Sequence, residues 1–140
     1  GDFPHTLEVL GTDAPVSVQC DSVRIEQVLT NLVSNAIKYS PKGGTVRIAL
    51  RVAADAVHVS VTDSGIGMGA DDQEHVFEPF RRSQTSRQGF PGVGLGLFVA
   101  RRIVAGHGGQ IDVESEEGRG STFEVRLPKV PPSVRARSVR

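Results

Sequence analysis

The amino-acid sequence predicts an α+β fold, in which helices cover one face of a mixed, mostly antiparallel sheet to form a two-layer sandwich. Two segments carry apolar residues at helical spacing, and several others alternate apolar and polar residues as strands do. These segments follow one another as strands, helix, strands, helix and hairpin. The 140 residues are enough for one domain with a core but not for two. A formal net charge of zero argues against a dedicated nucleic-acid binder.

The first half of the chain predicts two strands, a helix and a strand pair. "TLEVLG" and "VSVQC" alternate, so we expect two strands joined by a turn around Pro15. Asp21 has the position of an N-cap, and the apolar residues after it predict a helix that ends near Tyr39, ahead of Pro41. "TVRIALRV" and "VHVSVTD" alternate strictly and predict an antiparallel pair.

The second half predicts a short helix, a loop, a longer helix and a hairpin. "DDQEHVFEPF" predicts an acidic-capped helix that ends at Pro79, and residues 81–92 have no apolar period, so we expect a mobile loop there. "GLGLFVARRIVAGHGG" predicts the second long helix, and "QIDVES" with "STFEVRLP" predicts a hairpin. We therefore expect one domain over residues 1–128 and a disordered basic tail over residues 129–140.

Composition also bears on the compartment. No apolar run approaches the roughly 18–20 residues that span a bilayer, and the N-terminus lacks a signal-peptide pattern. These features predict a cytoplasmic chain with no direct membrane span. Cys20 is the only cysteine, which predicts a buried small apolar side chain in a reducing compartment rather than a disulfide or a metal ligand.

Asparagines are spaced along one stripe of the first predicted helix. Gln27, Asn31, Asn35 and Lys38 share a stripe beside its apolar face. Asparagine is a mediocre helix former, so two of them on one stripe need an explanation. An uncharged polar flank and a helix wall facing a charged ligand are equally good interpretations of this stripe alone. In the second, an amide oxygen would be a single protein ligand for Mg²⁺, with Lys38 facing phosphate oxygens.

A glycine-rich turn follows the second strand of the antiparallel pair, in "TDSGIGMG". Asp63 ends that strand, and Gly65 and Gly67 allow a close approach of the backbone. A local turn in which Asp63 bonds its own backbone is one interpretation. In the other, a buried carboxylate accepts the hydrogen bond of the adenine amine. Guanine presents a carbonyl oxygen at that position, so such a site would select ATP over GTP.

A second glycine run, "GVGLGL", comes just before the second long helix. Backbone amides at a helix N-terminus bind phosphate. No GK[ST] follows the run, so it is not a P-loop, and Leu97 stands where a Rossmann motif needs glycine. The VAIK, HRD and DFG motifs of eukaryotic protein kinases are missing from the sequence.

Together these motifs resemble the ATP-binding catalytic domain of sensor histidine kinases. "NLVSNAIKYS", "DSGIGM", "FEPF", "GVGLGL" and "GRGSTF" have the order and spacing of the N, G1, F, G2 and G3 boxes of that family. The resemblance covers roughly residues 16–128. It implies the Bergerat ATP-binding sandwich, which type II topoisomerases, a class of heat-shock chaperones and mismatch-repair ATPases share.

The resemblance also implies roles for individual residues, with ATP and Mg²⁺ as cofactors. Asn35 would be the Mg²⁺ ligand, Lys38 would contact phosphate and Tyr39 would stack on adenine. Asp63 would recognise the adenine amine, and Arg82 would reach the γ-phosphate. The other implied nucleotide contacts are Asn31, Gly65, Gly67, Arg87, Gly92, Val93, Gly94, Leu95, Gly96 and Thr122, the last with packing as an equal alternative. Phe77 and Phe80 would anchor the base of the loop over ATP.

One position separates kinases from hydrolases in this superfamily. The hydrolysing relatives place a glutamate base one helical turn before the metal-binding asparagine, where this chain has Asn31. Transfer to a separate histidine is therefore expected, because His5, His58, His75 and His107 lack the sequence context of an acceptor. The implied partners are a dimerisation and phosphoacceptor domain of the same kinase and a response regulator, in a parent protein with or without a membrane anchor. A serine kinase of the anti-sigma-factor type and a non-enzymatic nucleotide switch are the alternatives.

Overall fold

A five-stranded sheet forms one layer of the molecule. The computed structural model describes residues 5–11, 15–79 and 95–130. The strand order in the sheet is β1-β2-β3-β5-β4. Among the described strands, β1 and β2 pair in parallel and the other neighbours pair antiparallel. The strands are β1 (His5–Leu10), β2 (Gly44–Val52), β3 (Ala56–Asp63), β4 (Gln110–Glu116) and β5 (Gly120–Pro128).

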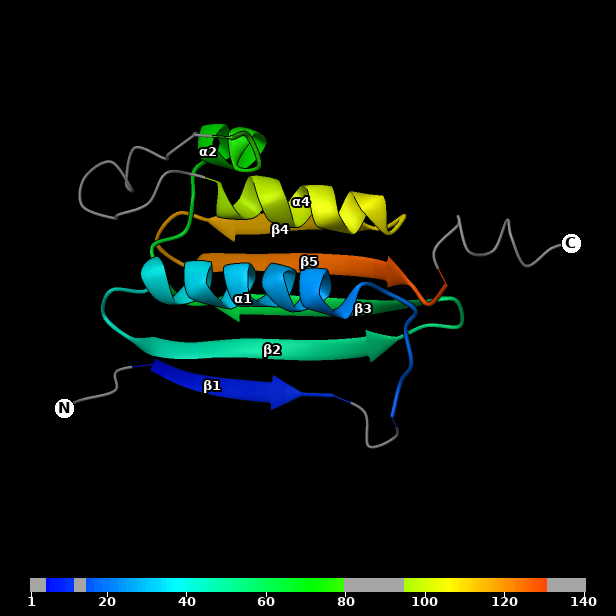
Figure 1. The fold of residues 1–140 in the computed structure, drawn as a ribbon. Coiled ribbons are helices and arrows are strands. Elements are labelled where there is room, and N and C mark those ends of the chain that lie inside the picture. The colour runs from blue at the N-terminus through cyan, green and yellow to red at the C-terminus, as the bar shows by residue number, and fades with distance from the viewer. Residues whose placement is uncertain (1–4, 12–14, 80–94, 131–140) are drawn as a thin grey trace, which may run out of the picture.

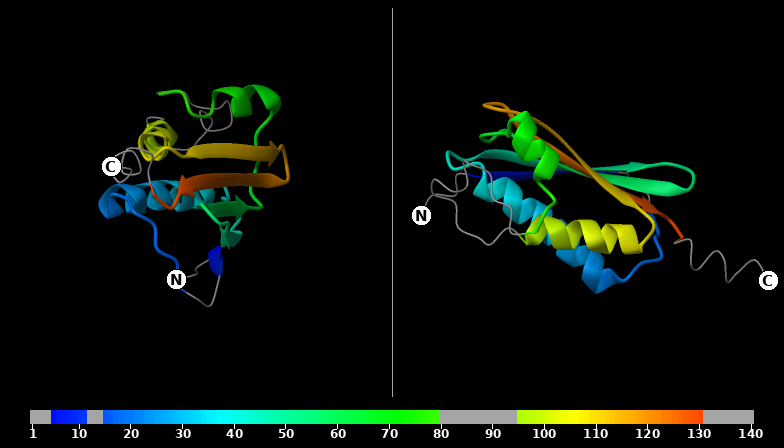
Figure 2. Two further views of the ribbon diagram at one scale, coloured as in Figure 1. Left: turned by 90° about the vertical axis from the view of Figure 1, so that its right-hand side faces the viewer. Right: turned by 90° about the horizontal axis from the view of Figure 1, so that it is seen from above.

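Helices form the second layer. α1 (Ser22–Lys38) and α4 (Gly96–Gly106) lie side by side over one face of the sheet, and the short α2 (Ala70–His75) lies near the β4 edge (Figures 1 and 2). In the described ranges, no helix covers the opposite face. The predicted two-layer sandwich with a mixed, mostly antiparallel sheet is therefore confirmed. None of the helices in these ranges is long and apolar enough to cross a membrane.

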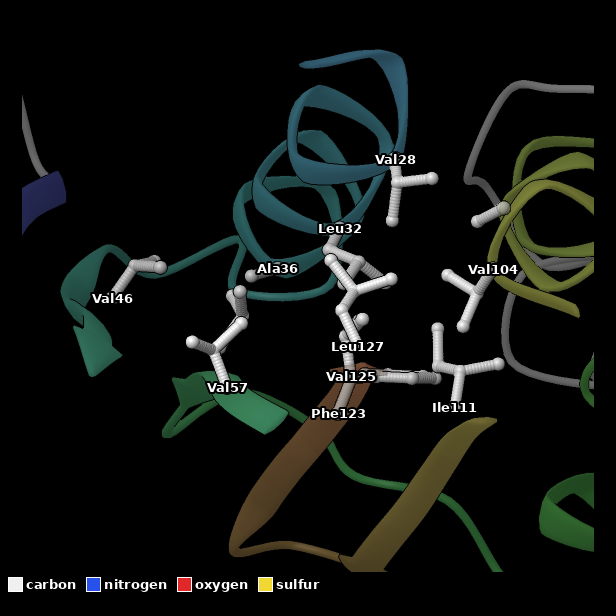
Figure 3. Packing of buried hydrophobic residues seen from close by; sticks show 12 residues of the cluster. Val28, Leu32, Ala36, Val46, Val57, Val104, Ile111, Phe123, Val125 and Leu127 are labelled. Atoms are coloured by element: carbon white, nitrogen blue, oxygen red, sulfur yellow. The ribbon is translucent and has the colours of Figure 1, made fainter. Parts of the chain in front are cut away.

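The core lies between the two layers. Val28 and Leu32 of α1 point toward Val104 of α4 and toward the β5 side chains Phe123 and Val125 (Figure 3). Each of these residues is at most 2% exposed. Because the inward residues of β5 alternate with polar ones, the strand buries one face only, as its sequence predicted.

α1 forms where the sequence predicted it. The Asp21 side chain accepts a hydrogen bond from the backbone N–H of Arg24 at 3.2 Å, which caps the first turn. The helix ends at Lys38, and the N–H of Tyr39 still donates to the carbonyl of Asn35 at 3.0 Å. Pro41, which disfavours helical backbone at the residue before it, lies three residues after the end of the helix.

Two predictions for residues 16–20 are wrong. "VSVQC" is not a strand, although Val16 and Val18 do pack against the core. Gln19 donates one backbone hydrogen bond to Lys129 at 2.8 Å instead of joining a ladder. Alternating apolar and polar residues indicate that one side of a segment is buried. An irregular extended segment can bury one side without pairing in a sheet. Cys20 is exposed rather than buried, since it lies where this segment leaves the core to reach the start of α1.

Two predicted helix boundaries also change. α2 ends at His75 rather than at Pro79, since Val76 and Glu78 donate their N–H groups to carbonyls only three residues back. α4 begins at Gly96, inside the glycine run. Lys129, the first residue after the predicted domain, donates its N–H to the carbonyl of Asp55 at 2.9 Å. The predicted mobile loop over residues 81–92 and most of the predicted tail, residues 131–140, lie outside the described residues.

Candidate functional site

The second half of α1 forms one wall of the site. Asn31, Asn35 and Lys38 are each half-buried on the flank of the helix, beside its buried apolar stripe. In the part of the chain that the structure describes, the side chains of Asn35 and Lys38 have no hydrogen-bonding partner. An amide oxygen and an ammonium group are thus both available to a ligand at the end of this helix.

The start of α4 lies beside this wall. The Nδ2 of Asn31 donates a hydrogen bond to the carbonyl of Gly96 at 3.1 Å. Leu95 is the N-cap of α4, and no side chain in the described ranges caps this end. The N–H groups of the first helical turn have no acceptor within the helix, and helix dipoles favour anions at such a position. The structure therefore brings the asparagine stripe and the end of the glycine run together.

Asp63 lies inside the sandwich at the end of β3. The residue is only 5% exposed. Its Oδ1 accepts a hydrogen bond from the backbone N–H of Gly65 at 2.9 Å. Burial raises the pKa of the Asp63 carboxyl, while backbone hydrogen bonds from Gly65 and Ser121 oppose that shift. A carboxylate with this little hydration is suited to accept a hydrogen bond from a buried ligand amine.

The turn after Asp63 packs against the end of α1. The N–H of Ile66 donates to the carbonyl of Tyr39 at 3.0 Å. A Cβ atom on Gly65 would lie 2.0 Å from that carbonyl oxygen, so only glycine fits here. This contact holds the backbone of Tyr39, the residue predicted to stack on adenine, against the turn that follows Asp63.

We expect Gly65→Ala to lower the free energy of unfolding by about 1–3 kcal/mol, because backbone atoms must move to admit the methyl group. Gly106→Ala is the matched control, since a Cβ atom there would meet nothing within 4 Å at the end of α4. We expect the control to be neutral or slightly stabilising. Urea denaturation measures both, and equal effects of the two substitutions would contradict the close approach at Gly65.

Gly67 attaches the same turn to the β4–β5 hairpin. Its φ of +69° is in the left-handed region, and a Cβ atom would lie 2.0 Å from the carbonyl oxygen of Glu116. The N–H of Gly118 donates to the carbonyl of Ile66 at 2.7 Å. The backbone after Asp63 is thus fixed from both sides, by α1 and by the hairpin.

Thr122 does not share a face of the sheet with Asp63. It pairs with Thr62, and the two hydroxyl oxygens are 3.0 Å apart. Since neighbouring residues of a strand point to opposite faces, Ser121, which pairs with Asp63, is the residue on the same face. Ser121 is 8% exposed and its Oγ lies 2.7 Å from the Oγ of Ser115. The interpretation of Thr122 as a packing residue is favoured, and Ser121 takes its place among the candidate site residues.

Acidity gives a second test of Asp63. The raised pKa means that the folded state binds the proton more tightly than the unfolded state, where the carboxyl has its ordinary value of 3.8. The resulting stabilisation is complete below the unfolded pKa and is lost as the pH rises through the folded pKa.

We therefore expect the free energy of unfolding of the parent, relative to Asp63→Asn, to fall as the pH rises from about 4 and then to level off. Denaturation with urea at a series of pH values measures this difference, in which the contributions of other carboxyls cancel. A difference that rises with pH, or stays flat, would contradict burial of a titrating Asp63.

Several predicted site residues are not part of the described ranges. The structure does not describe five of them, so their predicted contacts remain predictions: Arg82, Arg87, Gly92, Val93 and Gly94. Phe80 is also outside the described residues.

Phe77, the other aromatic predicted to anchor the loop, packs on the core. Its ring meets Phe123 edge-to-face at 6.1 Å, and the Arg101 guanidinium lies 5.4 Å from the ring centre. The structure thus places Phe77 at the junction of β5 and α4, and its predicted anchoring of the loop remains a prediction.

The fold and this site define a class of nucleotide-binding α/β sandwich. A family model described as "Histidine kinase-, DNA gyrase B-, and HSP90-like ATPase" matches residues 20–131. The chain belongs to this family. The predicted family, the Bergerat fold and the assignment as an ATP-binding domain are therefore confirmed.

Curated relatives of the chain are sensor histidine kinases. It is 44% identical over 128 residues to the sensor-like histidine kinase SenX3 of Mycobacterium tuberculosis, covering 91% of this chain and 29% of that protein. It is 42% identical over 119 residues to the sensor histidine kinase WalK of Bacillus subtilis, covering 83% of this chain and 20% of that protein. The chain thus spans less than a third of the length of these relatives.

Solved structures give the same class. The mycobacterial sensor histidine kinase MprB superposes with a TM-score of 0.78 at 31% identity, covering 91% of this chain and 84% of that one. The catalytic domain of the histidine kinase ThkA gives a TM-score of 0.74 at 35% identity, with coverage of 89% and 82%. Full-length ShkA, solved in complex with AMPPNP, gives a TM-score of 0.71 at 32% identity. The match covers 87% of this chain and 25% of the ShkA chain.

Proposed function

We propose that this chain presents Mg-ATP for transfer of the γ-phosphoryl group to a histidine on a separate dimerisation and phosphoacceptor domain. The phosphoryl group then passes to a response regulator. The observation that carries this proposal is the convergence of Asp63, the end of α1 and the uncapped start of α4 at one end of the sandwich. The AMPPNP bound to the related ShkA is an analogue of ATP, which supports a nucleotide in this chain as well.

In the proposed complex, adenine and phosphates contact different walls. Asp63 accepts the adenine amine beside the ring of Tyr39, and the first-turn amides of α4 face the phosphates. Asn35 fits a magnesium ion because its half-buried amide has no partner among the described residues. Mg²⁺ usually keeps waters and substrate phosphates as its other ligands, so one amide oxygen is sufficient. The ion would neutralise charge on the transferring phosphoryl group.

The side chain of Asn31 supports transfer rather than hydrolysis. An amide cannot take a proton from water at neutral pH, and this one already donates to the carbonyl of Gly96. It therefore positions α4 instead of activating a nucleophile. A kinase of this kind needs its acceptor from elsewhere.

Because the proposed substrate is ATP, we propose that this domain lies in the cytoplasm. The same holds if the full-length protein is anchored in a membrane. The serine kinase of the anti-sigma-factor type and the non-enzymatic switch are not favoured, because the curated relatives described above are sensor histidine kinases.

The chemical stability of the phosphoprotein tests the proposal. We expect the full-length protein to label itself from γ-labelled ATP, and the label to be lost in acid but kept in alkali, as phosphohistidine behaves. A label that survives acid would indicate phosphoserine instead. Absence of any label, with ATP bound, would indicate a switch.

A further inference from the structure

His107 connects the far ends of α1 and α4. It is the C-cap of α4, and its Nδ1 lies 2.8 Å from the carbonyl oxygen of Ile103. Its Nε2 lies 3.0 Å from the backbone nitrogen of Asp21. A carbonyl only accepts, so Nδ1 carries the proton, and Nε2 accepts the N–H of Asp21. The two contacts together require the neutral ring with the proton on Nδ1.

The N–H that His107 accepts lacks the partner that a capping box within α1 would supply. Asp21 is the N-cap of α1. In a capping box, a Glu or Gln at the third helical residue accepts the N–H of the N-cap. That third residue is Arg24 here, which has no acceptor atom. His107 supplies the missing acceptor from another helix, 86 residues away in sequence.

A second polar contact between the same helices lies at the nucleotide end. Asn31 donates to the carbonyl of Gly96 at 3.1 Å, so the two helices run antiparallel with one polar contact at each end of the shared span. The contacts are separated by ten residues along α1, about 15 Å, and by eleven along α4, about 16.5 Å. Between them lie buried apolar residues, Val28 on α1 and Ala100 and Val104 on α4, whose attraction is non-directional.

We propose that His107 is a positioning residue for the nucleotide site. By holding the end of α4 on the N-cap of α1, it sets how far α4 slides along α1. It thereby fixes the position of the backbone N–H groups in the first turn of α4 relative to Asn31 and Asn35. A slip of one residue would move those amides by about 1.5 Å, and errors of 1 Å are already costly at sites of this kind. This inference rests on the proposed function, because it assumes that ATP phosphates lie at the start of α4.

The affinity of the chain for Mg-ATP tests the inference. We expect His107→Ala to weaken binding about 3- to 10-fold, the loss of one net hydrogen bond, at a temperature where circular dichroism shows the variant folded. His107→Gln keeps an acceptor near the place of Nε2 and should recover most of the affinity. In the parent, long-range ¹H–¹⁵N correlation spectra should show the neutral ring with the proton on Nδ1.

A second substitution separates positioning from capping. Arg24→Gln provides a capping box within α1, so in the His107→Ala background it should restore thermal stability without restoring the affinity for ATP. Arg24→Gln alone controls for the lost charge. The inference would be overturned by recovery of affinity in the double variant, by unchanged affinity in His107→Ala, or by a proton on Nε2. A parent chain that binds no ATP would overturn the proposed function and this inference together.

Discussion

Replacing Asn35 with alanine is expected to lower phosphoryl transfer to histidine by roughly 100-fold or more. The proposed Mg²⁺ has one protein ligand, and without it the ion and the γ-phosphate lose their fixed position. The transition state of phosphoryl transfer depends on such positioning and on charge neutralisation. The rate of self-labelling of the full-length protein from γ-labelled ATP measures the loss.

Ser34→Ala is the matched control for this substitution. Ser34 precedes Asn35 on α1 and is exposed, so its replacement keeps the helix and leaves the site untouched. We expect near-parental transfer from the control. If Asn35→Ala also kept transfer within about threefold of the parent, the assignment of Asn35 as metal ligand would be wrong.

Asp63→Asn is expected to weaken ATP binding by about 1–3 kcal/mol, which is about 5- to 150-fold. The buried carboxylate loses its charge, and an amide can present an N–H to the adenine amine instead of an acceptor. The parent should bind GTP poorly, because guanine has a carbonyl oxygen in place of that amine. Isothermal titration calorimetry with both nucleotides measures the preference.

Asp112→Asn controls for the change of one charge, since Asp112 is exposed on β4. Its affinity for ATP should match that of the parent. Equal affinities of the parent for ATP and GTP would contradict the role of Asp63 in base selection.

The sequence predicted the fold because local and global signals agree in most elements. α1 has a capping aspartate, a helical apolar period and a proline after its end, and it forms as predicted. Residues 16–20 show the limit of such reasoning. Their alternation correctly predicted the burial of Val16 and Val18, but no property of the segment itself tells whether a neighbouring strand is present to pair with it.

The site shows a similar division. The glycine turns and Asp63 could be predicted because their motif has a fixed spacing. The sequence could not show whether Ser121 or Thr122 lies on the same face of the sheet as Asp63. A shift of one residue in the pairing of β5 with β3 would exchange the two faces. Only the alignment of Asp63 with Ser121 identifies the residue beside the carboxylate.

Contacts between distant segments were also beyond the sequence. The bond from Asn31 to Gly96 joins residues 65 apart, and His107 meets Asp21 across 86 residues. Both depend on how α1 and α4 pack in three dimensions. The arginine at position 24, which leaves the capping box of α1 incomplete, is the one signal in the sequence that points to an acceptor from elsewhere.

The fate of the γ-phosphate tests the central claim most directly, namely that this chain prepares ATP for a histidine and not for water. The measurement compares release of phosphate by the chain alone with labelling of the acceptor helices of its parent protein added in trans. We predict very slow hydrolysis, no self-labelling, and acid-labile phosphate on the added helices. Steady Mg²⁺-dependent turnover by the chain alone near 1 s⁻¹, the low end for working enzymes, with no labelling of the helices, would contradict the account.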